Sequence, residues 1–191
     1  MGDPSFAAFL GKLLSFSRLV LFDRSGGGLS DRGFGGQVFE EEMDDVRAVM
    51  AAVGSERAAA LFGCHTGGRL ALLLAATYPD LVSAVVTFGS HPATLRAEDH
   101  PWGSTLEEHE AVLAMIKGGE TFAEGASLLE MVGPSGADDL SVRHWFRTFI
   151  NSSASPAERY EGTRSLGPVD IVLATALQRR SRVTRTTGSR R

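Results

Sequence analysis

The apolar positions in the first half of the chain follow two patterns. In the first pattern they recur every three or four residues among charged positions, which is the period of an amphipathic helix. It predicts helices over residues 4–15 and 39–53, and a third helix, over residues 70–78, is apolar nearly all round. In the second pattern, short and nearly unbroken apolar runs resemble strands that are buried on both faces of a parallel sheet. It predicts strands over residues 18–22, 58–62 and 81–88.

These helices and strands alternate along the chain with short connections. Alternation of this kind predicts an α/β fold with a short parallel sheet of about three core strands, right-handed crossovers and flanking helices. Beyond residue 91 the pattern becomes helical, with helices predicted over residues 107–116, 121–131 and 140–150. A helical block after a sheet strand would suit a cap that lies over the strand ends.

The same patterns predict the domain organisation. We expect one domain over residues 1–156, with a sheet core over 1–90 and a helical cap over 91–156. Residues 157–191 are expected to form a disordered tail, because residues 178–191 are Arg, Ser and Thr with almost nothing apolar. Within that tail, residues 168–177 could still supply one strand, around residues 169–173.

Charge is distributed unevenly along the chain. The 191 residues carry a formal charge of −4, but residues 179–191 hold six arginines and no acid, so residues 1–178 carry −4 − 6 = −10. An acidic body does not favour a nucleic-acid partner, because affinity for the phosphate backbone comes from Lys and Arg. The basic tail could bind nucleic acid or acidic lipid weakly, although an unstructured tail accounts for it more simply.

Cysteine content and hydropathy bear on the compartment. The single cysteine, Cys64, cannot form an internal disulfide. No apolar run approaches the roughly 18 residues of a membrane span, and residues 1–4 lack the basic-then-apolar order of a signal peptide. These features predict a cytoplasmic protein without a membrane span.

One glycine-rich turn carries the main chemical signal. The stretch Gly63-Cys64-His65-Thr66-Gly67 joins an apolar strand to an apolar helix. Its spacing has the form of the nucleophile elbow, G-x-S-x-G, in which glycines allow a strained turn to lift one side chain above the sheet. The lifted residue here is His65, whereas a hydrolase needs a hydroxyl, thiol or carboxylate at that point.

Together these stretches resemble the α/β-hydrolase family over about residues 5–90. The likeness lies in Leu19-Val20-Leu21-Phe22-Asp23 with Gly26-Gly27-Gly28-Leu29-Ser30-Asp31, in Asp44-Asp45-Val46 through Ala58-Ala59-Ala60-Leu61-Phe62-Gly63, and in Gly67-Gly68 through Ala75-Ala76-Thr77-Tyr78-Pro79. Within that family, the sequence especially resembles the hydrolase-like domains that precede class III adenylate/guanylate cyclase domains. The stretches that resemble those domains are Phe16-Ser17-Arg18-Leu19, Met43-Asp44-Asp45-Val46-Arg47-Ala48-Val49 and His100-Pro101-Trp102-Gly103.

The chain also departs from that family. Members begin with further strands and a loop that helps to form the oxyanion hole, and they end with strands that bear the triad acid and histidine. Neither part has a counterpart here, so the resemblance implies a fold truncated at both ends, with residues 157–191 outside the family pattern. Ser25 stands where the family's D-x-R-G pattern has its arginine.

His65 has three interpretations. It is a decayed nucleophile in a non-catalytic fold, because imidazole at the elbow lacks an activating base and the oxyanion loop is missing. Alternatively, it is a functional group, such as a base acting on water or a covalently modified histidine. The third interpretation is a histidine that contacts a ligand or is merely buried.

The neighbouring candidates have plainer roles. Cys64 is expected to pack in the core rather than act as a nucleophile, and Thr66 to cap the helix that follows, although it could contact a ligand. Ser30 and Ser90 lie in loops that border the elbow, but a serine needs a base to become a nucleophile.

The remaining acids and histidines are less suited to catalysis. Asp80 is expected at the surface, and Asp170 would follow a strand end only if residues 169–173 form a strand. His91, His100, His109 and His144 fall in or next to the predicted cap, and their spacing does not suggest a metal site.

The sequence therefore predicts a hydrolase-fold protein that is catalytically degenerate. The alternatives are an active hydrolase of ester-type substrates and a cyclase-linked sensor or interaction module. No cofactor is expected, and the expected partners are a small apolar ligand and a second copy of the chain. Self-association would occur through exposed sheet edges, whose unpaired backbone groups invite pairing.

Overall fold

The computed structural model describes residues 4–31, 38–55, 59–118, 129–130 and 133–166. The chain divides into two compact units, each built from two segments. Unit 1 comprises Met1–Gly35 and Ala111–Glu161, and unit 2 comprises Gly36–Glu110 and Gly162–Arg191. The division between core and cap at residue 90 stays a prediction.

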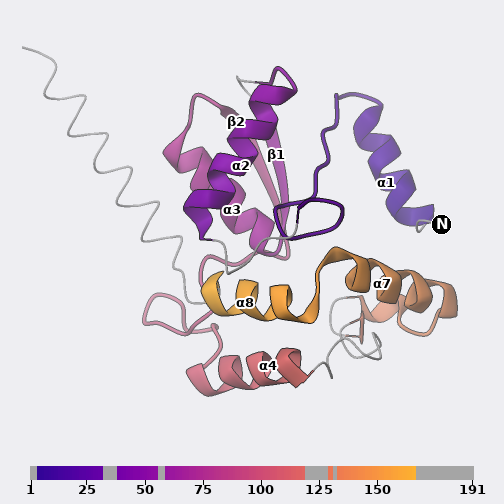
Figure 1. The fold of residues 1–191 in the computed structure, drawn as a ribbon, viewed down its shortest axis with the longest axis vertical. Coiled ribbons are helices and arrows are strands. Elements are labelled where there is room, and N and C mark those ends of the chain that lie inside the picture. The colour runs from indigo at the N-terminus through magenta and orange to yellow at the C-terminus, as the bar shows by residue number, and fades with distance from the viewer. Residues whose placement is uncertain (1–3, 32–37, 56–58, 119–128, 131–132, 167–191) are drawn as a thin grey trace, which may run out of the picture. The chain divides into compact units, whose positions relative to one another are not determined.

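Unit 2 contains the sheet and the two helices that pack on it. Along the chain these are α2 (Phe39–Ala52), β1 (Ala59–Cys64), α3 (Thr66–Thr77) and β2 (Val82–Phe88). β1 and β2 pair in parallel in a register that places Leu61 opposite Val85 and Cys64 opposite Phe88. Because the strands are parallel and α3 connects them, the elbow after β1 and the loop after β2 lie at the same edge of the sheet (Figure 1).

The core of unit 2 lies between the sheet and the two helices. Leu74, which is 0 % exposed, packs in a cluster with residues of α2 and α3. That cluster comprises Phe39, Met43, Val46, Met50, Leu73 and Leu74, and β1 and β2 contribute Ala59, Leu61 and Val82 against it. The periodic apolar positions of α2 thus face the sheet, while the acids in its first turn, where the helix dipole favours them, include the exposed Glu40 and Glu41.

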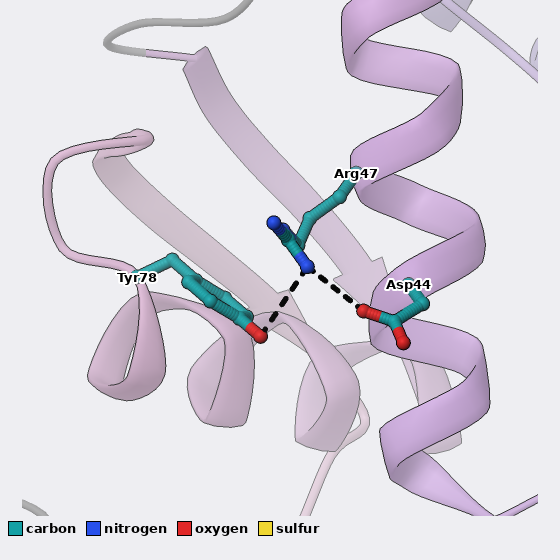
Figure 2. A network of polar contacts seen from close by, with 3 residues as sticks. All are labelled: Asp44, Arg47 and Tyr78. Atoms are coloured by element: carbon teal, nitrogen blue, oxygen red, sulfur yellow. Dashed lines mark hydrogen bonds and ion pairs between the residues drawn. The ribbon is translucent and has the colours of Figure 1, made fainter.

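A polar contact joins α2 to the end of α3. Figure 2 shows Arg47 of α2 reaching between Asp44 and Tyr78. Its Nη1 donates to Asp44 Oδ1 at 2.9 Å and to the Tyr78 hydroxyl at 3.5 Å, and its guanidinium carbon lies 4.4 Å from the centroid of the Tyr78 ring. Because Arg47 and Asp44 are exposed, the pair itself contributes little to stability.

Unit 1 contains α1 (Pro4–Leu14), α7 (Leu140–Ser153) and the glycine-rich loop that follows Asp23. Phe6 of α1 lies 6.2 Å from the ring of Trp145, which stacks on Phe149 at 5.5 Å. In the loop, the Gly28 N–H donates to the Ser153 carbonyl at 2.8 Å. A Cβ at Gly28, whose φ is +52°, would overlap the Asp23 carboxylate, so the loop needs a glycine there.

Two further helices, α4 and α8, begin with side-chain caps. α4 (Leu106–Gly118) follows a reciprocal pair in which the Thr105 N–H donates to Glu108 Oε2 at 2.7 Å and the Glu108 N–H donates to Thr105 Oγ1 at 3.1 Å. α8 (Pro156–Leu166) follows the same arrangement in Ser155 and Glu158. These boxes satisfy backbone N–H groups that would otherwise have no partner at a helix start.

The predicted α/β class and the short parallel sheet flanked by helices are confirmed. Two of the three predicted strands form, but the third, residues 18–22, is wrong, because this stretch has irregular backbone. A strand requires a pairing partner, and an apolar run does not specify one. The stretch belongs to unit 1, whereas β1 and β2 belong to unit 2.

The ends of several elements also differ from the sequence-based expectation. α3 begins at Thr66, four residues earlier than predicted, and α7 continues to Ser153. The disorder predicted from residue 157 is wrong for residues 157–166, which belong to α8. Most of the predicted helix over 121–131, the strand over 169–173 and the rest of the tail lie outside the described residues. Among the residues that are described, no helix is long and apolar enough to cross a bilayer.

Candidate functional site

The glycine-rich turn forms the elbow that the sequence predicts. β1 ends at Cys64 and α3 begins at Thr66, so His65 alone makes the turn. Its φ of 50° and ψ of −120° make it the only non-glycine residue with positive φ in the described ranges. Backbone strain of this kind costs roughly 1–3 kcal/mol and gathers at functional sites.

Two glycines let the strand and the helix approach each other at this turn. A Cβ at Gly63 would overlap the Gly67 carbonyl, and a Cβ at Gly68 would overlap the Ser90 hydroxyl. A Cβ at Gly67, by contrast, meets nothing within 4 Å. The sequence motif contains Gly63 and Gly67, but the positions at which packing leaves no room for a Cβ are Gly63 and Gly68.

Hydrogen bonds hold the backbone of His65 on both sides. Its N–H donates to the Phe88 carbonyl at 3.0 Å, which continues the β1–β2 ladder into the turn. Its carbonyl accepts from Ser90 Oγ at 2.8 Å and from the Gly68 N–H at 3.1 Å. The strained conformation is therefore fixed by the end of β2 and by the first turn of α3.

The His65 side chain is exposed and lies over Gly89, where an added Cβ would be 3.2 Å from the imidazole Cε1. Within the described part of the chain, no hydrogen bond joins this imidazole to a carboxylate or a hydroxyl. A general base or a nucleophile needs such a partner for orientation and activation. The described site therefore presents a lifted imidazole without a second catalytic group.

Cys64 directly precedes His65 at the elbow. Cys64 is exposed rather than packed in the core, which corrects the expectation from the sequence. It is the last residue of β1, and the core lies on the opposite face of the sheet. Burial of part of its side chain raises the pKa of the Cys64 thiol, which reduces the thiolate fraction at neutral pH.

Thr66 does not cap α3. The N-cap position is His65, and its side chain makes no capping hydrogen bond to this helix. The backbone N–H groups in the first turn of α3 therefore rely on other partners. Thr66 itself is half-buried.

The two candidate serines hold the backbone in place. Ser90 borders the elbow as expected, but its hydroxyl donates to the His65 carbonyl. Ser30 belongs to unit 1, where its hydroxyl donates to the Asp23 carbonyl at 2.6 Å. Neither hydroxyl has a base that would make it a nucleophile in the described structure.

Sequence reasoning missed a buried cation next to the elbow. Arg69, in the first turn of α3, is only 4 % exposed. Its Nη1 donates to Thr94 Oγ1 at 3.3 Å, and its guanidinium carbon lies 5.5 Å from the centroid of the Phe39 ring. Because a buried charge needs partners, Arg69 ties α3 to α2 and to the loop after β2. The sequence feature that could have indicated this buried cation is a single arginine in an otherwise apolar helix.

Two histidines of unit 2, His91 and His100, lie in the loop after β2, and His109 lies in α4. The His91 and His100 rings are 6.5 Å apart, and His100 meets Trp102 edge-on at 5.0 Å. His91 Nδ1 lies 2.7 Å from the Ala93 carbonyl oxygen, and His100 and His109 are buried. The described residues hold no group of three or more His, Cys, Asp or Glu side chains arranged for a metal ion.

The remaining candidate residues do not contribute to the described elbow. Asp80 is exposed in the turn that precedes β2, at the opposite edge of the parallel sheet from His65. Asp170 lies outside the described residues. His144 belongs to α7 in unit 1.

Solved structures with a similar fold include enzymes of different chemistry. An esterase from Exiguobacterium antarcticum superposes with a TM-score of 0.74 and 20 % identity, over 91 % of this chain and 66 % of the esterase. A bromoperoxidase from Bacillus anthracis superposes with a TM-score of 0.64 and 18 % identity, over 80 % of this chain and 56 % of the peroxidase. At this level of identity the likeness shows the fold alone, and the chain spans less than two thirds of either structure.

Sequence comparison gives one short match and one family match. A stretch of 67 residues is 39 % identical to a human protein described as major facilitator superfamily domain-containing protein 6-like, and it covers 35 % of this chain and 11 % of that protein. The model of the alpha/beta hydrolase fold family matches residues 5–123. This match covers more than half of the chain and includes both strands and the elbow, so the chain belongs to the α/β-hydrolase fold family.

Proposed function

We propose that this chain is a non-catalytic member of its family, in which the elbow is kept but the nucleophile is replaced by His65. The observation that carries the proposal is the combination of a strained elbow backbone with an imidazole at its tip. The glycines and the Ser90 hydrogen bond preserve a geometry that serves to lift a nucleophile. The lifted group is the His65 imidazole, which is not the hydroxyl, thiol or carboxylate nucleophile that such an elbow presents in a hydrolase.

An imidazole at this position is a poor replacement for an activated serine. Ester hydrolysis through a covalent intermediate needs a nucleophile that is oriented by a base, and an oxyanion hole that stabilises the developing charge. Within the described part of the chain, His65 makes no contact with an acid that could orient it. Without an oriented and activated nucleophile, the expected rate is close to that of free imidazole in water.

The test uses two classes of ester. Unactivated alkyl esters report enzymatic catalysis, whereas p-nitrophenyl esters also react with any exposed imidazole. We expect wild-type protein and the His65→Ala variant to hydrolyse unactivated esters equally slowly. With p-nitrophenyl acetate, His65→Ala and the matched variant His91→Ala, which removes another exposed imidazole, should lower the background rate by similar small amounts. Turnover of an alkyl ester by wild type that His65→Ala abolishes would overturn the proposal.

Ester hydrolysis is the second candidate function. It is favoured by the preserved elbow and by the likeness to an esterase in the fold. Because the site has no serine at the elbow, the nucleophile would have to be another group, such as the exposed Cys64 thiol. Labelling with a fluorophosphonate and with a thiol-reactive probe, followed by mapping of the adduct, would identify it. If no adduct forms with the fluorophosphonate and thiol labelling leaves any esterase activity unchanged, this candidate fails.

Other expectations from the sequence stay predictions. A small apolar ligand would raise the unfolding temperature of the wild-type protein, which a thermal-shift screen of short-chain acids and esters would detect. A cyclase-linked sensor or interaction module would be supported by capture of a cyclase domain in a pull-down with the purified chain. The cytoplasmic location also stays a prediction from the sequence.

A further inference from the structure

Unit 1 carries a cluster of partly exposed aromatic side chains on two of its helices. Phe6 and Phe9 of α1 have ring centroids 6.5 Å apart, and Phe6 lies beside Trp145 of α7, which stacks on Phe149. Phe6 is 45 % exposed and Phe149 is 49 % exposed, although both rings pack on other aromatic rings. We call Phe6, Phe9, Trp145 and Phe149 the aromatic surface. Exposed apolar patches mark places that contact a partner or a membrane.

The charges on these two helices have one sign. α1 carries Lys12 as its only charged residue, and α7 carries Arg143 and Arg147. Neither helix contains Asp or Glu, whereas α2 of unit 2 contains five acids and one arginine. Lys12 and Arg147 are exposed, while Arg143 Nη2 lies 3.6 Å from Glu130 Oε1. Asp139 precedes α7 and caps its N-terminus. The helices that carry the aromatic surface therefore supply exposed cations but no acid.

This combination fits the surface of an anionic bilayer better than the surface of a protein. A bilayer accepts aromatic side chains at the level of its headgroups, and it requires no groove or matched shape. Its anionic headgroups attract Lys and Arg and repel acids, so helices with cations and no acid are complementary to it. A stable protein interface takes about 20–30 residues from each side, many more than the aromatic surface offers.

We propose that unit 1 binds the surface of an anionic lipid bilayer through the aromatic surface, with Lys12 and Arg147 against the headgroups. Lys12 follows Phe9 by three residues, so the two side chains share one side of α1. α1 has 11 residues and is about 16 Å long, which suits a helix that lies in the plane of the interface. Insertion of this kind places aromatic rings roughly 5–10 Å deep, at the boundary between headgroups and acyl chains.

The two tryptophans of the chain allow a direct test by fluorescence quenching. Trp145 belongs to the aromatic surface, and Trp102 lies in unit 2. Trp102→Phe leaves Trp145 as the only tryptophan, and Trp145→Phe leaves Trp102. Each variant is mixed with vesicles of phosphatidylcholine and phosphatidylglycerol whose brominated acyl chains quench a tryptophan on contact. We expect quenching of Trp145 and none of Trp102. Quenching of neither, or of Trp102 at least as strongly as Trp145, would overturn the proposal.

Removal of charge tests the role of the cations. The affinity of the full chain for the same vesicles, without bromine, is measured by co-sedimentation at low salt. Each cation near an anionic surface contributes about fivefold in affinity, so Lys12→Gln and Arg147→Gln together should weaken binding about twenty-five-fold. Arg47→Gln, the control, removes an exposed cation from α2 in unit 2 and should leave the affinity nearly unchanged. If the double variant binds like wild type, the lipid site lies elsewhere, for example in the arginine-rich tail, and the proposal fails.

Removal of an aromatic ring tests insertion. Phe149→Ala should weaken binding about tenfold, because a ring that enters the bilayer leaves water. Phe88→Ala, the control, removes an exposed ring from β2 in unit 2 and should leave the affinity unchanged. Far-UV circular dichroism checks that both variants fold, and the quenching experiment does not depend on either of them. A folded Phe149→Ala variant with wild-type affinity would contradict the proposal.

Sedimentation without lipid separates a bilayer from a second copy of the chain. If the aromatic surface binds lipid, wild type and Phe149→Ala should have the same molar mass in solution. A dimer that Phe149→Ala dissociates would assign the aromatic surface to a second copy and would also overturn the proposal.

Discussion

The hydroxyl of Ser90 donates a 2.8 Å hydrogen bond to the carbonyl of His65, across the edge of the sheet where β1 and β2 end. His65 occupies a strained backbone conformation, and Ser90 lies on the loop that follows β2. The bond therefore joins the elbow to the neighbouring strand end. The same hydroxyl occupies the space into which a Cβ at Gly68 would project.

Loss of this hydroxyl should weaken the elbow. The Ser90→Ala substitution removes the only side-chain donor to the His65 carbonyl in the described structure. We expect the free energy of unfolding to fall by about 1 kcal/mol, the usual net contribution of one hydrogen bond. Urea denaturation followed by circular dichroism would measure it. An unchanged midpoint and slope would mean that water replaces the hydroxyl without cost.

The two glycines at the start of α3 should respond oppositely to alanine. Gly68→Ala places a methyl group against the Ser90 hydroxyl, and we expect it to destabilise the protein by about 2 kcal/mol or more. Gly67→Ala is the matched control, because the added methyl meets nothing within 4 Å. Alanine favours a helix over glycine by about 1 kcal/mol, so Gly67→Ala should be neutral or stabilising. Thermal unfolding of both variants tests the pair, and similar losses in both would contradict the packing at the elbow.

Relief of strain at His65 should stabilise the fold. Glycine adopts positive φ without a steric penalty, so His65→Gly should raise the free energy of unfolding by about 1 kcal/mol. His65→Ala keeps a Cβ in the strained conformation and should leave stability nearly unchanged. The comparison uses denaturant unfolding of the three proteins under the same conditions. A His65→Gly variant less stable than His65→Ala would show that the conformation carries little strain.

The N-cap of α7 should make stability depend on acid. Asp139 accepts hydrogen bonds from Ser141 and Val142, and these bonds hold the pKa of its carboxyl below the ordinary value. A carboxyl whose pKa is lower in the folded state stabilises the fold above its unfolded pKa, and this contribution is lost as pH falls through the folded pKa.

The difference in stability between wild type and Asp139→Ala should therefore be full at neutral pH and shrink below about pH 4. Chemical denaturation at a series of pH values measures it. The Asp138→Ala variant, which removes a neighbouring carboxyl that is not the N-cap of α7, serves as the control. A difference that stays constant down to pH 2 would contradict the proposed role of the charge.

Much of the local structure could be predicted from the sequence. The periodic apolar positions of α2 and the apolar runs of β1 and β2 specify these elements, because periodicity records which side of an element is buried. The elbow could be predicted as well, since glycines on both sides of His65, between an apolar strand and an apolar helix, form the pattern of a strained strand-to-helix turn.

The sequence by itself determined the order of the elements, the elbow and the presence of a histidine rather than a serine at its tip, because each depends on residues that are near one another along the chain. Only the tertiary structure decided which runs pair, since residues 18–22 have the composition of a strand but no strand partner in the described sheet. It also decided that Gly68 rather than Gly67 is sterically required, that Arg69 is buried, and that Cys64 lies on an exposed face. Each of these outcomes depends on atoms that are distant in sequence and meet only when the chain is folded.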